Sequence, residues 1–156
     1  MGKLKCYDIF ITHAWRFHDD WRRFSELLDK APGVNWRNFS LPWHDPAMNA
    51  NSEVGGRFIR DFLESQITPV HAVVLLSGVY SIASARRWFD MEVEMALKLH
   101  KPLIGIPAIG EASVPSDVAV LCDACCSWDP LQVIETIDYL RDLPKYRNRG
   151  VSSPFR

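Results

Sequence analysis

One glutamate of this sequence lies where an acidic side chain is expected to face apolar neighbours. If residues 84–100 form a helix, successive residues advance by about 100°, and Glu92 points about 160° away from a charged stripe. That stripe is formed by Arg87, Asp90, Glu94, Lys98 and Lys101. The helical neighbours of Glu92 are Trp88 one turn before it, and Met95 and Ala96 one turn after it. A carboxylate in apolar surroundings is costly unless it has a partner or a chemical role, so Glu92 is the first catalytic candidate. The alternative is a buried structural acid that accepts a hydrogen bond from a backbone amide or a serine.

The elements that must position Glu92 alternate between strand and helix along the chain. Apolar β-rich runs predict strands over residues 6–12, 34–40, 70–77, 102–107 and 120–128, and helical periodicity predicts helices over 15–30, 53–66, 84–100 and 130–143. Residues 41–56 read as a long loop, and residues 108–120 read as irregular with a single turn. This alternation predicts an α/β fold: a flavodoxin-like five-stranded parallel sheet, order 2-1-3-4-5, with helices on both faces. The run at 70–77 is the most apolar, so we expect the third strand to be central.

Ligands of such folds bind at the carboxyl ends of the strands, near the switch point between the first and third strands. Residues predicted at that edge are candidates for substrate binding. They are His13, Ala14 and Trp15 after the first strand, Asn38, Phe39 and Asp45 after the second, Ser77 after the third, and Trp88 on the following helix. Alternatives remain for several of them: Trp88 also suits core packing, His13 a rim histidine bonded to backbone, and Asp45 a turn before Pro46.

Composition narrows the class of protein. The 156 residues suit one domain, and a hydrophobic content of 47% is that of an ordinary globular chain. A net charge of -1 gives no reason to expect nucleic acid or an anionic membrane as a partner. No apolar run reaches the roughly 18 residues of a membrane span, and the N-terminus shows no secretory pattern, so a cytoplasmic location is expected.

The cysteines are best interpreted as reduced thiols in and beside a buried strand. Cys122, Cys125 and Cys126 form a Cys-x-x-Cys-Cys cluster, and Cys6 is far away in sequence. A zinc site would require a second pair of ligands at a suitable spacing, which the sequence does not supply.

Several other chemistries fail for lack of their motifs. The loop after the first strand lacks the glycines of a flavin phosphate cradle, and the third strand ends at Ser77 without a phosphoacceptor aspartate. Gly-x-Gly-x-x-Gly, Walker and Gly-x-Ser-x-Gly patterns are absent. What remains is one acid among aromatic side chains. That combination suits a nucleotide, because aromatic planes stack on bases and a carboxylate stabilises positive charge on a ribose carbon as a glycosidic bond breaks.

Four segments resemble Toll/interleukin-1 receptor (TIR) domains, most closely the TIR-like ThsB proteins of bacterial Thoeris antiphage systems. They are residues 7–15, 36–46, 88–96, with the Trp-x-x-x-Glu pattern ending at Glu92, and 101–106. The resemblance covers roughly residues 6–142, so we predict a TIR-like domain over 1–143 and a basic, loose C-terminal tail over 144–156.

The resemblance implies an NAD-cleaving enzyme with Glu92 as its catalytic residue. NAD would be a substrate, and neither a metal nor a prosthetic group is expected. The product would be a cyclic ADP-ribose-type nucleotide or an ADP-ribose conjugate that activates a separate effector protein, and a homo-oligomer is possible. Some TIR enzymes carry arginines at the positions of Ala14 and Trp15, which leaves Arg16 or backbone amides to hold the phosphates. The alternatives are a non-catalytic TIR adaptor and a transferase acting on free nucleosides.

Overall fold

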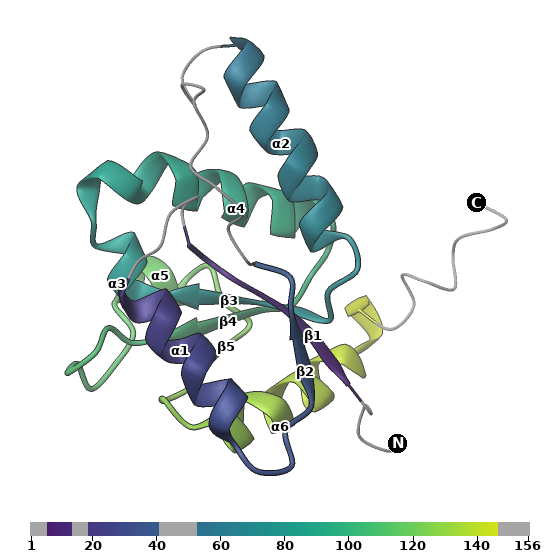
Figure 1. Ribbon diagram of the computed structural model, residues 1–156, viewed down its shortest axis with the longest axis vertical. Coiled ribbons are helices and arrows are strands. Elements are labelled where there is room, and N and C mark those ends of the chain that lie inside the picture. The colour runs from purple at the N-terminus through teal and green to yellow at the C-terminus, as the bar shows by residue number, and fades with distance from the viewer. Residues whose placement is uncertain (1–5, 14–18, 41–52, 147–156) are drawn as a thin grey trace, which may run out of the picture.

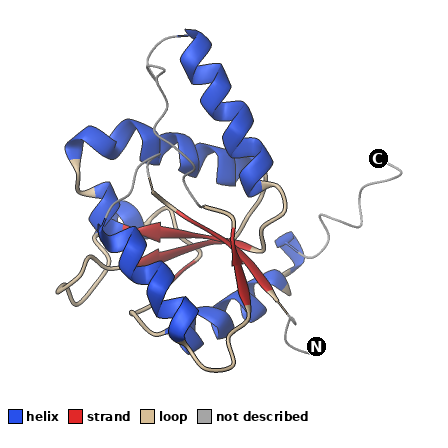
Figure 2. Ribbon diagram, viewed as in Figure 1, coloured by secondary structure: helices blue, strands red, loops and turns tan. Residues whose placement is uncertain are grey.

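A five-stranded parallel sheet forms the centre of the protein (Figures 1 and 2). The computed structural model describes residues 6–13, 19–40 and 53–146, with the side chains of residues 53–55 excepted. The strands are β1 (Tyr7–Ile11), β2 (Trp36–Asn38), β3 (Ala72–Leu76), β4 (Leu103–Ile106) and β5 (Ala124–Cys125). Their order is β2-β1-β3-β4-β5, and every neighbouring pair is parallel. The predicted fold class and strand order are confirmed.

Helices cover both faces of this sheet. They are α1 (Asp19–Lys30), α2 (Glu53–Ile67), α3 (Ser77–Tyr80), the 3₁₀ helix η1 (Ala83–Ala85), α4 (Arg86–Lys98), α5 (Ser116–Ala119) and α6 (Pro130–Arg141). In Figure 1, α1 and α6 lie on one face and α2 and α4 on the other. All residues of β1, β3 and β4 are buried, as expected for strands covered on both sides.

Local sequence explains where the helices form. The inner face of α1 buries Trp21, Phe24 and Leu28 at helical spacing, and its outer face carries charges. Helix α6 begins with Pro130, and the side chain of Asp129 accepts hydrogen bonds from the backbone amides of the first turn. The single turn expected within residues 108–120 is α5.

The predicted position of Lys101 on the charged stripe is wrong. The stripe residues Arg87, Asp90, Glu94 and Lys98 are exposed, but α4 ends at Lys98 and His100 adopts a positive φ of 57°. This reversal directs Lys101 inward, where it is 6% exposed and its Nζ donates to the Thr68 carbonyl at 2.7 Å. A helical wheel does not apply to a residue beyond the end of its helix.

Two further features concern the ends of the fold. Strands β2 and β5 are only three and two residues long, shorter than predicted. They form the two edges of the sheet. Lys145 and Tyr146, which fall in the predicted tail, bind the carboxylate of Asp123. In the part of the chain described, no helix is both long and apolar enough to cross a bilayer.

Candidate functional site

The chain after β1 is tied directly to β3. The Thr12 amide donates to the Val74 carbonyl at 2.9 Å, and the Thr12 Oγ1 accepts a hydrogen bond from the Leu76 amide at 3.0 Å. Both bonds lie at the carboxyl edge of the sheet, where the order of strands changes direction. They fix the position of the next residue, His13, at the switch point.

His13 and Glu92 meet in the interior at this edge. The distance from His13 Nδ1 to Glu92 Oε2 is 3.8 Å, and each side chain is 1% exposed. The imidazole packs 5.4 Å from the Phe10 ring and edge-on to Trp21 at 6.2 Å, measured between ring centroids. A separation of 3.8 Å is within ion-pair distance but longer than a hydrogen bond. The fold thus brings together two predicted site residues that are far apart in the sequence.

Asn38 takes part in a polar network that sequence reasoning did not find. Its Oδ1 accepts hydrogen bonds from the amide (2.9 Å) and the hydroxyl of Ser40. The Trp21 Nε1 donates to Ser40 Oγ at 3.1 Å, and Asn38 Nδ2 lies 3.4 Å from Ser25 Oγ. This network holds the end of β2 against α1 beside His13. Trp21 lies in the helix predicted over residues 15–30, but helical periodicity shows which face is buried and not what an indole N–H will meet.

The other candidates lie in different surroundings. Ser77, 2% exposed, begins α3 directly after β3. Phe39 is half-buried, with the Arg37 guanidinium 5.6 Å from its ring. Trp88 is half-buried and packs against the main hydrophobic core, as its alternative interpretation allowed. Ala14, Trp15 and Asp45 lie outside the described residues.

Asp20 is a second acid near the switch point that the sequence analysis missed. Its carboxylate, on the first turn of α1, occupies the space that a β-carbon on Gly78 would need. Gly78 follows Ser77 in α3, so the carboxylate lies against the segment that leaves β3. A Gly78 side chain would displace Asp20. The only sequence signal was a glycine one residue after a candidate site residue, which is too common to interpret alone.

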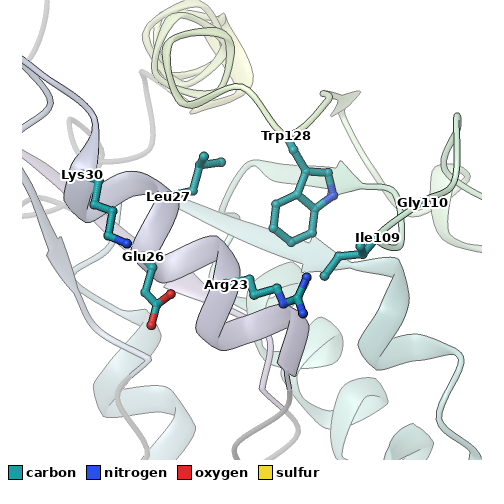
Figure 3. Close-up of a pocket in the computed structure, with 7 residues that line it drawn as sticks. All are labelled: Arg23, Glu26, Leu27, Lys30, Ile109, Gly110 and Trp128. Carbon is teal, nitrogen blue, oxygen red and sulfur yellow. The ribbon is translucent and has the colours of Figure 1, made fainter.

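A pocket with a volume of about 540 Å³ lies elsewhere. Figure 3 shows it between α1, the loop after β4 and the indole of Trp128; it is lined by Arg23, Glu26, Leu27, Lys30, Ile109, Gly110 and Trp128. The indole is anchored because Nε1 donates to the Pro107 carbonyl at 2.8 Å and the ring meets Phe24 edge-on. Neither Glu92 nor His13 lines this pocket. The segments 14–18 and 41–52, which contain predicted cleft residues, lie outside the described part of the chain.

Within residues 6–13, 19–40 and 53–146 there is no group of three or more His, Cys, Asp or Glu side chains that could hold a metal ion. All four cysteines are free thiols.

Fold and site together define the class of this protein. A doubly wound parallel sheet of order 2-1-3-4-5, with Glu92 buried on the long helix α4 between β3 and β4, is the arrangement of a TIR-like domain. The family model described as Thoeris protein ThsB, TIR-like domain, matches residues 10–112, and the chain belongs to this family. The matched range runs from β1 past β4 and includes both His13 and Glu92. A comparison with curated proteins finds no match. The protein is therefore a TIR domain associated with Thoeris defence.

Proposed function

We propose that this protein cleaves NAD at the nicotinamide–ribose bond and makes a signalling nucleotide in antiphage defence. The observation that carries the proposal is the buried Glu92, 3.8 Å from His13, at the switch point of a ThsB-type TIR domain. Buried ionisable groups are concentrated at functional sites because their burial is otherwise costly.

The chemistry requires one well-placed negative charge. When the bond between nicotinamide and the ribose C1′ breaks, the bonding electron pair stays with the nicotinamide nitrogen, which becomes neutral. Positive charge then develops on C1′ and the ring oxygen of the ribose. The Glu92 carboxylate would stabilise this oxocarbenium-like transition state and orient the ribose. No general acid is needed, because the leaving group already carries the positive charge before cleavage.

His13, Asn38, Ser77 and Trp88 would shape the site around Glu92. In the structure, Glu92 and His13 are each 1% exposed, so the ribose reaches the carboxylate only after the covering side chains move. An opening of this kind suits an enzyme that is silent until it is triggered, because the closed state withholds the carboxylate from a substrate that is always present in the cell.

The fate of the ribosyl carbon determines the product. With water excluded, a nucleophilic group of the same molecule gives a cyclic ADP-ribose-type nucleotide, and a second substrate gives an ADP-ribose conjugate. A hydroxyl or N–H nucleophile loses its proton to solvent as its bond to C1′ forms. The product would then activate a separate effector protein. In this proposal NAD is the substrate, and a homo-oligomer could complete the cleft.

The test compares three versions of the full chain: the wild type, Glu92→Gln and Glu94→Gln. Glu94 is the matched control because it lies two residues further along α4 and is exposed. Each is incubated with NAD over a range of protein concentrations, and nicotinamide and nucleotide products are measured by mass spectrometry. We expect nicotinamide release from the wild type and from Glu94→Gln, and a loss of about 10²- to 10³-fold for Glu92→Gln.

Two results would count against the proposal in different ways. Full activity of Glu92→Gln would refute the catalytic role of Glu92. A wild type that is folded by circular dichroism but releases no nicotinamide at any concentration, even when mixed with extract of phage-infected cells, would favour the adaptor function. Consumption of free nucleosides without NAD cleavage would identify the transferase alternative.

A further inference from the structure

Two cysteine sulfurs lie over the same point of the central sheet. Gly105, in the middle of β4, is paired in register with Cys125 of β5. A β-carbon on Gly105 would lie 2.9 Å from Cys122 Sγ and 3.3 Å from Cys125 Sγ. The two thiols therefore share the space that a side chain at position 105 would fill.

The glycine is informative because it stands inside a strand. Glycine weakens a strand interior and usually marks a close approach by another group. Here the approaching group is the pair of sulfurs, with a methyl group of Val114 beside them. Burial, and next the neighbouring Cys125 thiol, raise the pKa of Cys122 to about 12. The space shared at Gly105 thus places the two thiols side by side.

Cys126 belongs to different surroundings although it is adjacent in sequence. Its Sγ lies 3.3 Å from Thr136 Oγ1 of α6, because successive residues of an extended chain point to opposite sides. The cluster Cys-x-x-Cys-Cys therefore divides into a facing pair, Cys122 and Cys125, and a separate buried thiol. Sequence spacing alone does not distinguish these partners.

The two thiols of the pair differ in their exposure to solvent. Cys125 is exposed, whereas Cys122 is partly buried and its Sγ donates to the Val118 carbonyl at 3.2 Å. A thiol with a raised pKa stays protonated at neutral pH and reacts slowly with oxidants. Cys125 is therefore the thiol that meets an oxidant first, and Cys122 is positioned to react with it afterwards.

We propose that Cys122 and Cys125 form a reversible disulfide with a peroxide as the oxidant. The thiolate of Cys125 attacks one peroxide oxygen, the O–O bond breaks, and a sulfenic acid forms while the other oxygen leaves as hydroxide, which takes up a proton to give water. The Cys122 sulfur then attacks the Cys125 sulfur, and the S–O bond breaks. The hydroxyl leaves with the Cys122 proton as water. The pair loses two electrons, the peroxide gains them, and a dithiol reductant reverses the change by thiol–disulfide exchange.

The test uses the reduced full chain treated with hydrogen peroxide, followed by alkylation of the remaining thiols. Cleavage before aspartate separates residues 117–122, which contain Cys122, from residues 123–128, which contain Cys125 and Cys126. We expect the two fragments to be joined without reductant and to separate when a dithiol is added. A disulfide between Cys125 and Cys126 would instead leave the fragments separate.

Variants identify the partner and the order of events. Cys125→Ser should abolish the joined fragments, and Cys126→Ser, the matched control, should leave them unchanged. Cys122→Ser should leave a sulfenic acid on Cys125 that a dimedone-type reagent traps. Gly105→Ala should slow the joining, because its methyl group displaces the sulfurs. The proposal is overturned if the wild-type fragments stay separate after peroxide treatment, whether Cys125 is unmodified or carries only added oxygen, or if Cys126→Ser prevents the joining.

Discussion

Replacing Tyr146 with phenylalanine removes one hydroxyl and tests whether the chain beyond residue 143 belongs to the folded domain. The Tyr146 hydroxyl donates to Asp123 Oδ2 at 2.6 Å. The same carboxylate accepts from the Leu103 amide at 2.9 Å and from Lys145 Nζ at 2.8 Å. Asp123 therefore joins the start of β4 to a segment that the sequence analysis assigned to a loose tail.

The magnitudes follow from the exposure of each partner. A hydrogen bond to a charged group contributes about 1.5–3 kcal/mol, and Tyr146 is only half-buried, so we expect Tyr146→Phe to cost about 1.5 kcal/mol. Lys145 is 62% exposed, and Lys145→Met should cost about 0.5 kcal/mol. Asp123→Ala removes all three bonds and leaves the Leu103 amide without this acceptor, so about 3 kcal/mol is expected.

Lowering the pH should weaken the hydrogen bonds that the Asp123 carboxylate accepts. Burial opposes ionisation of Asp123, but the hydrogen bonds from Lys145, Tyr146 and Leu103 outweigh it and lower the pKa of the carboxyl below 3.8. The unfolded chain then binds a proton more readily than the native one. The stability contributed by Asp123 is therefore present above pH 3.8 and is lost as the pH falls through the lower native pKa.

The assay is urea unfolding at neutral and acidic pH. Tyr139→Phe is the matched control, because Tyr139 lies on α6 and is 67% exposed. Its free energy of unfolding should stay within about 0.5 kcal/mol of the wild type. The reasoning fails if Tyr146→Phe is as stable as this control, or if the difference between the wild type and Asp123→Ala is unchanged below pH 3.8.

Two further predictions concern buried polar groups. Burial lowers the pKa of His71 although Asp8 raises it, and His71 Nδ1 accepts from the Asp8 amide at 2.9 Å. The native state should therefore lose stability as the pH falls from 6.5 toward the lowered pKa. Urea unfolding between about pH 5 and pH 7.5 should show a smaller loss for His71→Gln than for the wild type. The same pH profile for both proteins would contradict this role of His71. Lys101→Met removes the donor to the Thr68 carbonyl and should cost about 1–3 kcal/mol in thermal unfolding, whereas the exposed Lys98→Met should change stability by less than about 0.5 kcal/mol. Equal losses of stability in Lys101→Met and Lys98→Met would show that the buried hydrogen bond from Lys101 to Thr68 contributes nothing to stability.

The strand order was predictable because each signal behind it is local. Continuous apolar runs for strands and helical periodicity between them depend on neighbouring residues only. Parallel connections with right-handed crossovers then leave few possible orders, and the carboxyl edge of the sheet is the same in all of them. The burial of Glu92 followed from the helical wheel, because α4 extends four or more residues to each side of it.

Contacts between distant segments were not predictable from such signals. The network of Trp21, Ser40 and Asn38, and the carboxylate of Asp20 against Gly78, join residues whose separation in space depends on how α1 packs on the sheet. Lys101 was misplaced because one residue with positive φ ends the helix and changes the direction of the following side chain.

The sequence by itself determined the α/β class, the order of the strands, the family resemblance and the choice of Glu92, since periodicity and motif spacing are properties of short segments. Only the tertiary structure decided that His13 faces Glu92, that the sulfurs of Cys122 and Cys125 lie near Gly105 while Cys126 lies against α6, and that Asp123 holds Lys145 and Tyr146. The physical reason is that side-chain partners are selected by close packing in three dimensions, where a shift of one residue in register or a single glycine changes which atoms meet.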